Sequence, residues 1–311
     1  TASTALWISF ICPICNACQS LQLRGSCFVG LSNFKTILMG GADYASQGLH
    51  EEFALFFKNT VIIWVGNFIP QIALSLLLAV WFTDLRVKMP GKGFFKVVMY
   101  MPNIITAASV AGLFLSLFGP SSYSVLNSIY LSNHEGAEAL RWLAIESVWP
   151  ARFIVMFIQV WMWFGNTMIM LMAGIQGINE SLFEAAEIDG ANSTQTFWRI
   201  TFPLLKSIMV YTLLTSMIGG LQMFDIPYML HEGQTLNRNI ATAAIFIYQK
   251  FHDNYMSPSY GYSAAASVIL FIITSVLGAL VFYVQRDKDA IEKNRKRKQA
   301  IKEAKRKAKG G

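Results

Sequence analysis

Charge is scarce in this sequence, and that scarcity excludes an ordinary soluble protein. Asp, Glu, Lys and Arg make up 14% of the 311 residues, whereas a soluble domain carries about 25%. Hydrophobic residues reach 54%, and the mean hydropathy is +0.43. Six runs contain none of these four charged residues, and each can supply the ~17 to 25 apolar residues of a membrane-spanning helix. They predict an all-α polytopic membrane protein with about six transmembrane helices, at 1–23, 59–83, 97–118, 153–179, 207–224 and 254–285.

The apolar runs also lack the groups that would power transport from within the chain. They contain no histidine, acid or lysine, although proton-driven carriers keep such groups at membrane depth. Gly91-Lys92-Gly93 is not a P-loop, because the first glycine and the Ser or Thr after the lysine are missing. We find neither paired carboxylates nor a Ser/His/Asp set, so the sequence does not suggest an enzyme. We therefore predict no catalytic residues and no cofactor in this chain. If the chain moves a solute uphill, the energy must come from a partner.

The cysteines are few, and their setting does not predict a metal centre. Three of them lie in the first apolar run as CPICNAC. A metal cluster would need four thiolates brought together on a folded loop, so we interpret them as small apolar side chains on a helix. Disulfides among them remain open. The four residues are Cys12, Cys15, Cys18 and Cys27.

The basic residues are distributed unevenly between the connections. Residues 84–96, 181–206 and 286–311 together hold 18 of the 25 Lys and Arg residues. Cytoplasmic connections carry the excess of such residues in membrane proteins, so we place both termini and the connection 181–206 in the cytoplasm. The C-terminal tail has no aromatic side chains for stacking on bases, which favours membrane lipid over nucleic acid as its partner.

The same pattern predicts how the chain is divided. We expect a first transmembrane helix at 1–23, with residues missing before Thr1, and an external segment at 24–58. A core of five helices follows at 59–285, and a basic cytoplasmic tail at 286–311.

The clearest helix punctuation in a polar segment lies at 181–203, between the fourth and fifth apolar runs. Ser181 and Glu184 have the spacing of a capping box, so a short helix is predicted to begin at Ser181. Gly190 suits the left-handed residue that ends such a helix, and Asn192 suits a second N-cap. Pro203 fits the first turn of the next apolar helix. The pattern predicts two short helices that project from the membrane, a shape suited to contact with a partner.

The segment contains Glu184-Ala185-Ala186, followed by Gly190, Ile200, Phe202 and Pro203. This pattern resembles the EAA loop of binding-protein-dependent ABC importer permeases. Phe202 stands where the family pattern has leucine. Other stretches are similar to the carbohydrate branch, the maltose-transport-like type I permeases, namely FVGLSNF at 28–34, LQMFDIPYML at 221–230 and GYSAAASVILFI at 261–272. HEGQT at 231–235 departs from the glycine-rich turn of many relatives. The residues that match the EAA motif are Glu184, Ala185, Ala186, Gly190, Ile200, Phe202 and Pro203.

The resemblance implies a type I permease fold in a prokaryotic inner membrane, together with a set of partners. A second homologous permease would complete a central pathway, and an extracytoplasmic solute-binding protein would deliver the solute. ATP and Mg would be held by a cytoplasmic ATPase dimer. Residues 181–203, called the coupling loop below, would dock on that ATPase and move as a rigid lever.

The resemblance also implies where a solute passes. Maltose-type permeases contact it from the fourth span and late in the fifth, which here corresponds to Trp163, Asn166, Ser216, Gly220 and Met223. Independently of the resemblance, Trp161 and Trp163 lie near amide side chains, a combination that suits a sugar, although interhelical packing explains either tryptophan taken singly. The absence of Arg and Lys from the spans favours a neutral solute such as an oligosaccharide over an anion. The alternatives are a non-sugar solute and, less favoured, a stand-alone carrier.

Overall fold

The computed structural model describes residues 11–12, 27–84, 90–134, 136–144, 146–230, 236–252 and 260–285. Their regular structure is helical except for one antiparallel pair of short strands, β1 Ile11–Cys12 and β2 Cys27–Phe28. Cys12 lies opposite Cys27 in this pair. Ile11–Cys12 is therefore extended rather than helical. The rest of the predicted first transmembrane helix, which includes Cys15 and Cys18, lies outside the described residues. The predicted tail at 286–311 also lies outside them.

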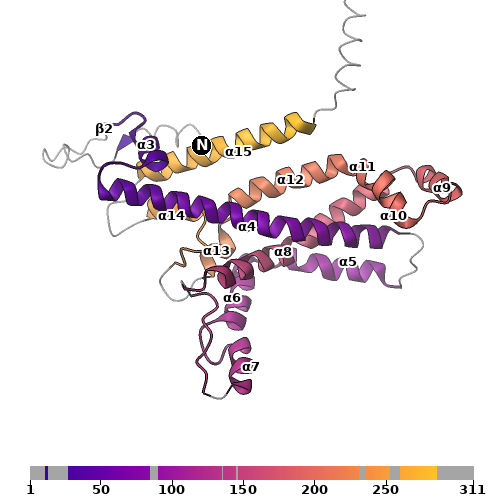
Figure 1. Cartoon of the computed structure of the whole chain (residues 1–311), viewed down its shortest axis with the longest axis horizontal. Helices are drawn as coiled ribbons and strands as arrows, with labels where there is room; N and C mark the ends of the chain where they lie inside the picture. Colours follow the sequence, from indigo (N-terminus) through magenta and orange to yellow (C-terminus); the bar gives the residue numbers. More distant parts are fainter. Residues whose placement is uncertain are drawn as a thin grey trace, which may run out of the picture.

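Four helices in the described part of the chain are long and apolar enough to cross a membrane. Three are continuous, namely α4 Tyr44–Thr83, α8 Val148–Gln176 and α15 Tyr260–Gln285. The fourth runs over Lys206–Met229 and comprises α12 Lys206–Leu221 and α13 Asp225–Met229. The four long helices extend along the longest axis of the molecule (Figure 1). α8 has 56% of its apolar window buried, against 28 to 33% for the others, so it forms the centre of the bundle.

The third apolar run, which the sequence predicted as one transmembrane helix, forms two helices with a bend between them. It forms α5 Lys92–Tyr100, a 3-10 turn η1 Met101–Ile104, and α6 Ala107–Phe118, with a bend of 92° between the two halves. Pro102 lies in the first turn of η1, where its missing N–H is not needed, and the helical path ends at Ile105, whose backbone is extended with φ −71° and ψ 136°. Thr106 then starts α6 by accepting a hydrogen bond from the Ser109 amide. The apolar run predicted as a span over 97–118 is therefore two helices with a sharp bend between them, which form either one broken span or a re-entrant loop.

The helix that contains the second apolar run begins well before residue 59. Asp43 caps α4 by accepting a hydrogen bond from the Ser46 amide at 3.0 Å, and contacts with Ser46 hold the pKa of the Asp43 carboxyl below its usual value. The helix has 40 residues, which at 1.5 Å per residue corresponds to about 60 Å. That is about twice the thickness of a bilayer core, so α4 extends beyond the membrane. Its first part, residues 44–58, belongs to the predicted external segment.

The remaining helices are short. α3 Ser32–Met39 lies against α4 and α15, and α14 Ala243–His252 packs on the same two helices. α6 and the following α7 Val125–Asn133 leave the bundle at a steep angle (Figure 1). The right-hand end of the bundle in Figure 1 carries α9 Glu180–Ile188, α10 Ser193–Thr196, the π-helical turn η2 Phe197–Thr201 and α11 Phe202–Leu204.

Candidate functional site

A cavity of about 430 Å³ lies between α4, α8, α12 and the start of α13. Its lining includes five residues that the sequence comparison with maltose-type permeases singled out, although these come from two different helices and the loop after α12. The structure thus brings together Trp163, Asn166, Ser216, Gly220 and Met223. Trp163 is 46% exposed, whereas Trp161 does not line the cavity and instead packs against Phe114, with 5.9 Å between ring centroids.

The wall contributed by α4 was missed from the sequence. Trp64, Asn67 and Gln71 line the cavity, and none of them was among the predicted pathway residues. Their spacing of three and four residues places them on one face of α4. A search for polar and aromatic side chains with helical spacing in the second apolar run could have found all three. Gln71 also donates a hydrogen bond to Thr167 of α8 at 2.8 Å, which ties the two walls together.

The polar lining of the cavity is rich in amides and poor in charge. Gln159 and Gln222 add to the amides of Asn67, Gln71 and Asn166. Among the described lining residues there is no Lys, Arg or His, and Asp225 is the one ionisable acid. The cavity can therefore offer both hydrogen-bond donors and acceptors to a neutral solute.

A second hollow, of about 750 Å³, lies between α8, α9 and α12 on the side of the coupling loop. Asn179 and Leu182 contribute to it from the start of α9. Met170 and Tyr211 line both this hollow and the cavity. Met170 also accepts a hydrogen bond from the Thr212 hydroxyl at 3.4 Å, so α8 and α12 are in contact where the two spaces adjoin.

The end of the bundle opposite the coupling loop is fastened by a buried polar network. Asn59 of α4 is fully buried and donates hydrogen bonds to the carbonyl oxygens of Arg238 and Ala241. Its own carbonyl oxygen accepts a hydrogen bond from Arg152 of α8 at 2.6 Å. Arg152 also donates to the Asn239 carbonyl at 3.1 Å, so one amide and one guanidinium secure the chain just before α14.

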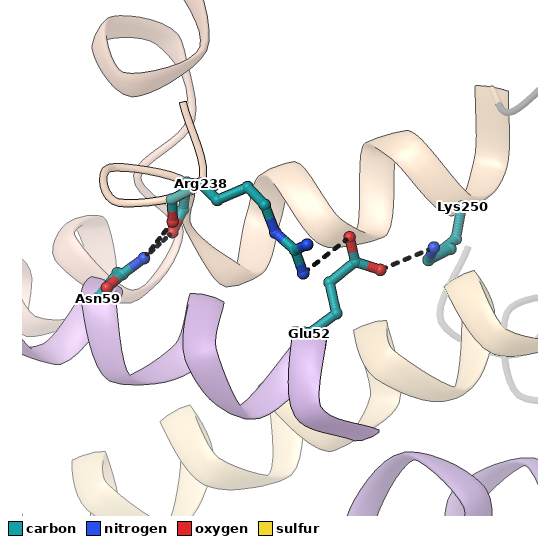
Figure 2. A network of polar contacts seen from close by, with 5 residues as sticks. Glu52, Asn59, Arg238 and Lys250 are labelled. Carbon is teal, nitrogen blue, oxygen red and sulfur yellow. Dashed lines mark hydrogen bonds and ion pairs between the residues drawn. The ribbon is translucent and has the colours of Figure 1, made fainter. Parts of the chain in front are cut away.

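Ion pairs extend this network toward the surface. The Glu52 carboxylate, on α4, lies 2.9 Å from the Lys250 ammonium and 3.9 Å from the Arg238 guanidinium. Figure 2 shows the Glu52 carboxylate between these two cations, and Asn59 turned toward the backbone at Arg238. The same segment reaches the cavity wall, because the Thr242 hydroxyl donates to the Met223 carbonyl at 2.6 Å. The position of Met223 therefore depends on how the segment before α14 is held.

The first half of the coupling loop is a capped helix, with a different cap from the one predicted. α9 begins after Asn179, whose side chain accepts a hydrogen bond from the Ser181 amide at 3.1 Å. The predicted Ser181–Glu184 capping box is therefore wrong, because the N-cap lies two residues earlier. The Glu184 and Ala185 side chains are exposed, whereas Ala186 is buried. The motif thus places its carboxylate outward and one of its alanines inward.

The predicted role of Gly190 as the end of this helix is confirmed. Its φ is +73°, a conformation that residues with a Cβ rarely adopt. The Ala191 amide donates to the Ala186 carbonyl at 2.9 Å, and the Gly190 amide to that of Glu187 at 3.1 Å. These two bonds form a Schellman motif, which turns the chain sharply between α9 and α10.

The second half of the loop is also capped, as expected at Asn192. Asn192 and Gln195 exchange side-chain to backbone hydrogen bonds of 2.8 and 2.9 Å, which is a reciprocal capping box. Phe202 packs in an aromatic trio with Phe197 and Trp198, while Ile200 is half-buried and Pro203 is exposed. Leu205, directly after α11, is fully buried in a cluster with residues of α4 and α8, so the loop is anchored in the core of the bundle.

Comparison with known proteins agrees with this arrangement. Residues 59–289 match the family described as "Binding-protein-dependent transport system inner membrane component". The chain is 32% identical over 232 residues to the lactose transport system permease protein LacF of Rhizobium radiobacter, covering 74% of this chain and 75% of LacF. It is also 32% identical over 254 residues to the arabinooligosaccharides transport system permease protein AraP of Bacillus subtilis, covering 81% and 74%. The crystal structure of a bacterial ABC transporter involved in the import of the acidic polysaccharide alginate contains a similar fold, with a TM-score of 0.69 at 22% identity and 83% of each chain covered.

Because the family match spans most of the sequence, the chain belongs to the inner-membrane permease components of binding-protein-dependent ABC transporters. It is a multi-pass membrane protein and a non-catalytic subunit of a complex that includes a solute-binding protein. The family resemblance that the EAA motif suggested is confirmed.

Proposed function

We propose that this chain is a permease subunit of an importer for a neutral oligosaccharide. The main observation in support is the lining of the cavity, which combines aromatic rings with five amide side chains and, among its described residues, lacks any cation. Aromatic faces suit the apolar face of a sugar ring, and amides can donate to and accept from its hydroxyls. Two relatives are named for the transport of lactose and of arabinooligosaccharides.

The pathway itself is proposed to include the five residues carried over from the family, Trp163, Asn166, Ser216, Gly220 and Met223. A second homologous permease closes the open side of the cavity in this proposal. The excess of Lys and Arg near the coupling loop supports a cytoplasmic position for the loop and both termini. The solute-binding protein then docks at the opposite end of the bundle, where the segment before α14 lies.

The coupling loop is proposed as the contact with a cytoplasmic ATPase dimer, which holds the ATP and Mg. The buried Leu205 joins the loop to the transmembrane core, and the two capped turns make it rigid. Exposed apolar side chains, Leu182, Ile188 and Trp198, offer a surface for the ATPase. The proposed coupling residues are Glu184, Ala185, Ala186, Gly190, Ile200, Phe202 and Pro203.

The test is transport by the complete importer in liposomes, with its second permease, ATPase and solute-binding protein. Lactose, an arabinotriose and maltotriose represent neutral sugars, and glycerol 3-phosphate and an alginate trisaccharide represent anions. We expect uptake of a neutral sugar that stops when either ATP or the binding protein is omitted. Uptake of an anion alone would contradict the proposed substrate class, and uptake by this chain without an ATPase would contradict the proposed mechanism.

A further inference from the structure

Trp64 is held in the cavity wall by contacts to two of the residues that the family comparison assigned to the solute. Its indole N–H donates a hydrogen bond to the Ser216 hydroxyl at 3.3 Å. The ring also lies against the backbone at Gly220, where an added Cβ would overlap Trp64 Cδ1. On its own helix it stacks with Phe68, with centroids 6.1 Å apart and an interplanar angle of 26°. The orientation of the indole is therefore fixed from α4 and from α12.

These contacts change the roles available to Ser216 and Gly220. The Ser216 hydroxyl accepts from the indole, and Gly220, which is buried, lies beneath the ring. The resemblance implied that Ser216 and Gly220 contact the solute. Because the Trp64 ring lies against both residues and also lines the cavity, a solute at this place meets the indole.

From this geometry we infer that Trp64 is a substrate-contacting residue of the pathway, and that Ser216 and Gly220 are positioning residues for its ring. This inference rests on the proposed function. The indole forms a flat wall for the apolar face of a neutral sugar ring, while the nearby amides of Asn67 and Gln71, on the same face of α4, bind hydroxyl groups. An aromatic contact to a sugar does not depend on its anomeric linkage, so the same wall serves successive rings of an oligosaccharide.

The inference is tested with the complete importer in liposomes and the neutral sugar that wild type transports in the panel above. The quantity measured is the number of sugars imported per ATP hydrolysed. Trp64→Leu is expected to lower this ratio about tenfold, the equivalent of losing one good aromatic contact. Trp64→Phe should keep most of the wild-type number of sugars imported per ATP, because it retains an aromatic ring. ATPase stimulation by the loaded binding protein should stay within about twofold of wild type in both variants, because the coupling loop is unchanged.

Gly220→Ala provides an independent variant, because it retains the indole but its Cβ forces the ring to move. It should lower the ratio in the same way as Trp64→Leu, and the double variant should be no worse than Trp64→Leu alone. Trp161→Leu is the matched control, because this residue lies in the same bundle but away from the cavity. If Trp64→Leu fails to assemble, Gly220→Ala decides the question by the same ratio.

Three results would overturn the inference. The first is a wild-type ratio in Trp64→Leu or Gly220→Ala. The second is an equal loss in Trp64→Phe and Trp64→Leu, since that would assign the effect to packing or to the Ser216 hydrogen bond. The third is a loss of ATPase stimulation well beyond twofold in Trp64→Leu and Gly220→Ala, which indicates a general structural defect. If wild type carries only an anion, the proposed function fails first, before any variant is compared.

Discussion

Replacement of Asn59 by leucine should destabilise the permease strongly, although leucine is apolar and similar in size. Asn59 makes three hydrogen bonds in a site with no solvent exposure, two as donor and one as acceptor. The variant leaves two carbonyl oxygens and one guanidinium N–H without these partners. A hydrogen bond to a charged group contributes ~1.5 to 3 kcal/mol, and an unsatisfied neutral group costs ~1 to 3 kcal/mol. Because Arg152 keeps its bond to the Asn239 carbonyl, we expect a total loss of about 3 to 5 kcal/mol.

The charge on Arg152 makes this prediction specific. Arg152→Met removes the buried cation together with its hydrogen bonds, so it should cost less than Asn59→Leu. The double variant Asn59→Leu/Arg152→Met should be more stable than the sum of the single effects predicts, because the uncompensated buried charge is gone. Asn133→Leu serves as the control. Asn133 is exposed and bonds only within α7 among the described contacts, so its replacement should change stability by less than about 0.5 kcal/mol.

The measurement is reversible denaturant unfolding of the purified permease in mixed micelles, followed by circular dichroism. A loss below 1 kcal/mol for Asn59→Leu would refute the reasoning, because it would mean that water or a rearranged segment satisfies Arg152. Strict additivity in the double variant would equally refute it, since the two side chains would then not interact.

Three further predictions concern the coupling loop and the surface. Glu184→Arg changes an exposed side chain, so the unfolding midpoint should stay unchanged while ATPase stimulation by the loaded binding protein falls at least about tenfold, a difference of ~1.4 kcal/mol; wild-type stimulation would contradict the docking proposal. Gly190→Ala forces a Cβ into the left-handed region at about 1 to 2 kcal/mol, which should speed hydrogen exchange at the Ala191 amide, and unchanged exchange would contradict the Schellman assignment. Glu52→Gln removes the ion pair with Lys250, in which the two side chains are 22% and 18% exposed, so it should cost more than the ~1 kcal/mol upper limit of an exposed pair, and high salt should change this loss little; a loss that disappears in high salt would contradict a partly buried pair.

Much of the membrane architecture could be predicted because the free energy of burying backbone and charge in lipid is large. Uncharged runs therefore coincide with α4, α8, α12 and α15. The position of Gly190 was predictable for a similar reason, since a left-handed residue strongly favours glycine. The helix cap was not, because Asn179 and Ser181 are both good N-cap residues and the choice between them depends on where α8 ends.

The bend between α5 and α6 and the role of Trp64 depend on contacts between distant parts of the chain. Pro102 marks a discontinuity in the sequence, but proline in a spanning helix is compatible with a mild kink as well as with a 92° turn. Asn103 donates a hydrogen bond to the Met162 carbonyl of α8 at 3.4 Å, a partner 59 residues away that the sequence does not reveal. Gly220 was identified, but as a solute contact, because nothing local shows that an indole from α4 lies on it.

The two side chains shared by the cavity and the hollow beside α9 have a mechanical consequence. Met170 and Tyr211 belong to α8 and α12, the two helices that the coupling loop connects. If the loop transmits force as proposed, it acts on both of these helices at once and changes the separation between Met170 and Tyr211. The space on the α9 side can then change while Trp64, which belongs to α4, keeps its position.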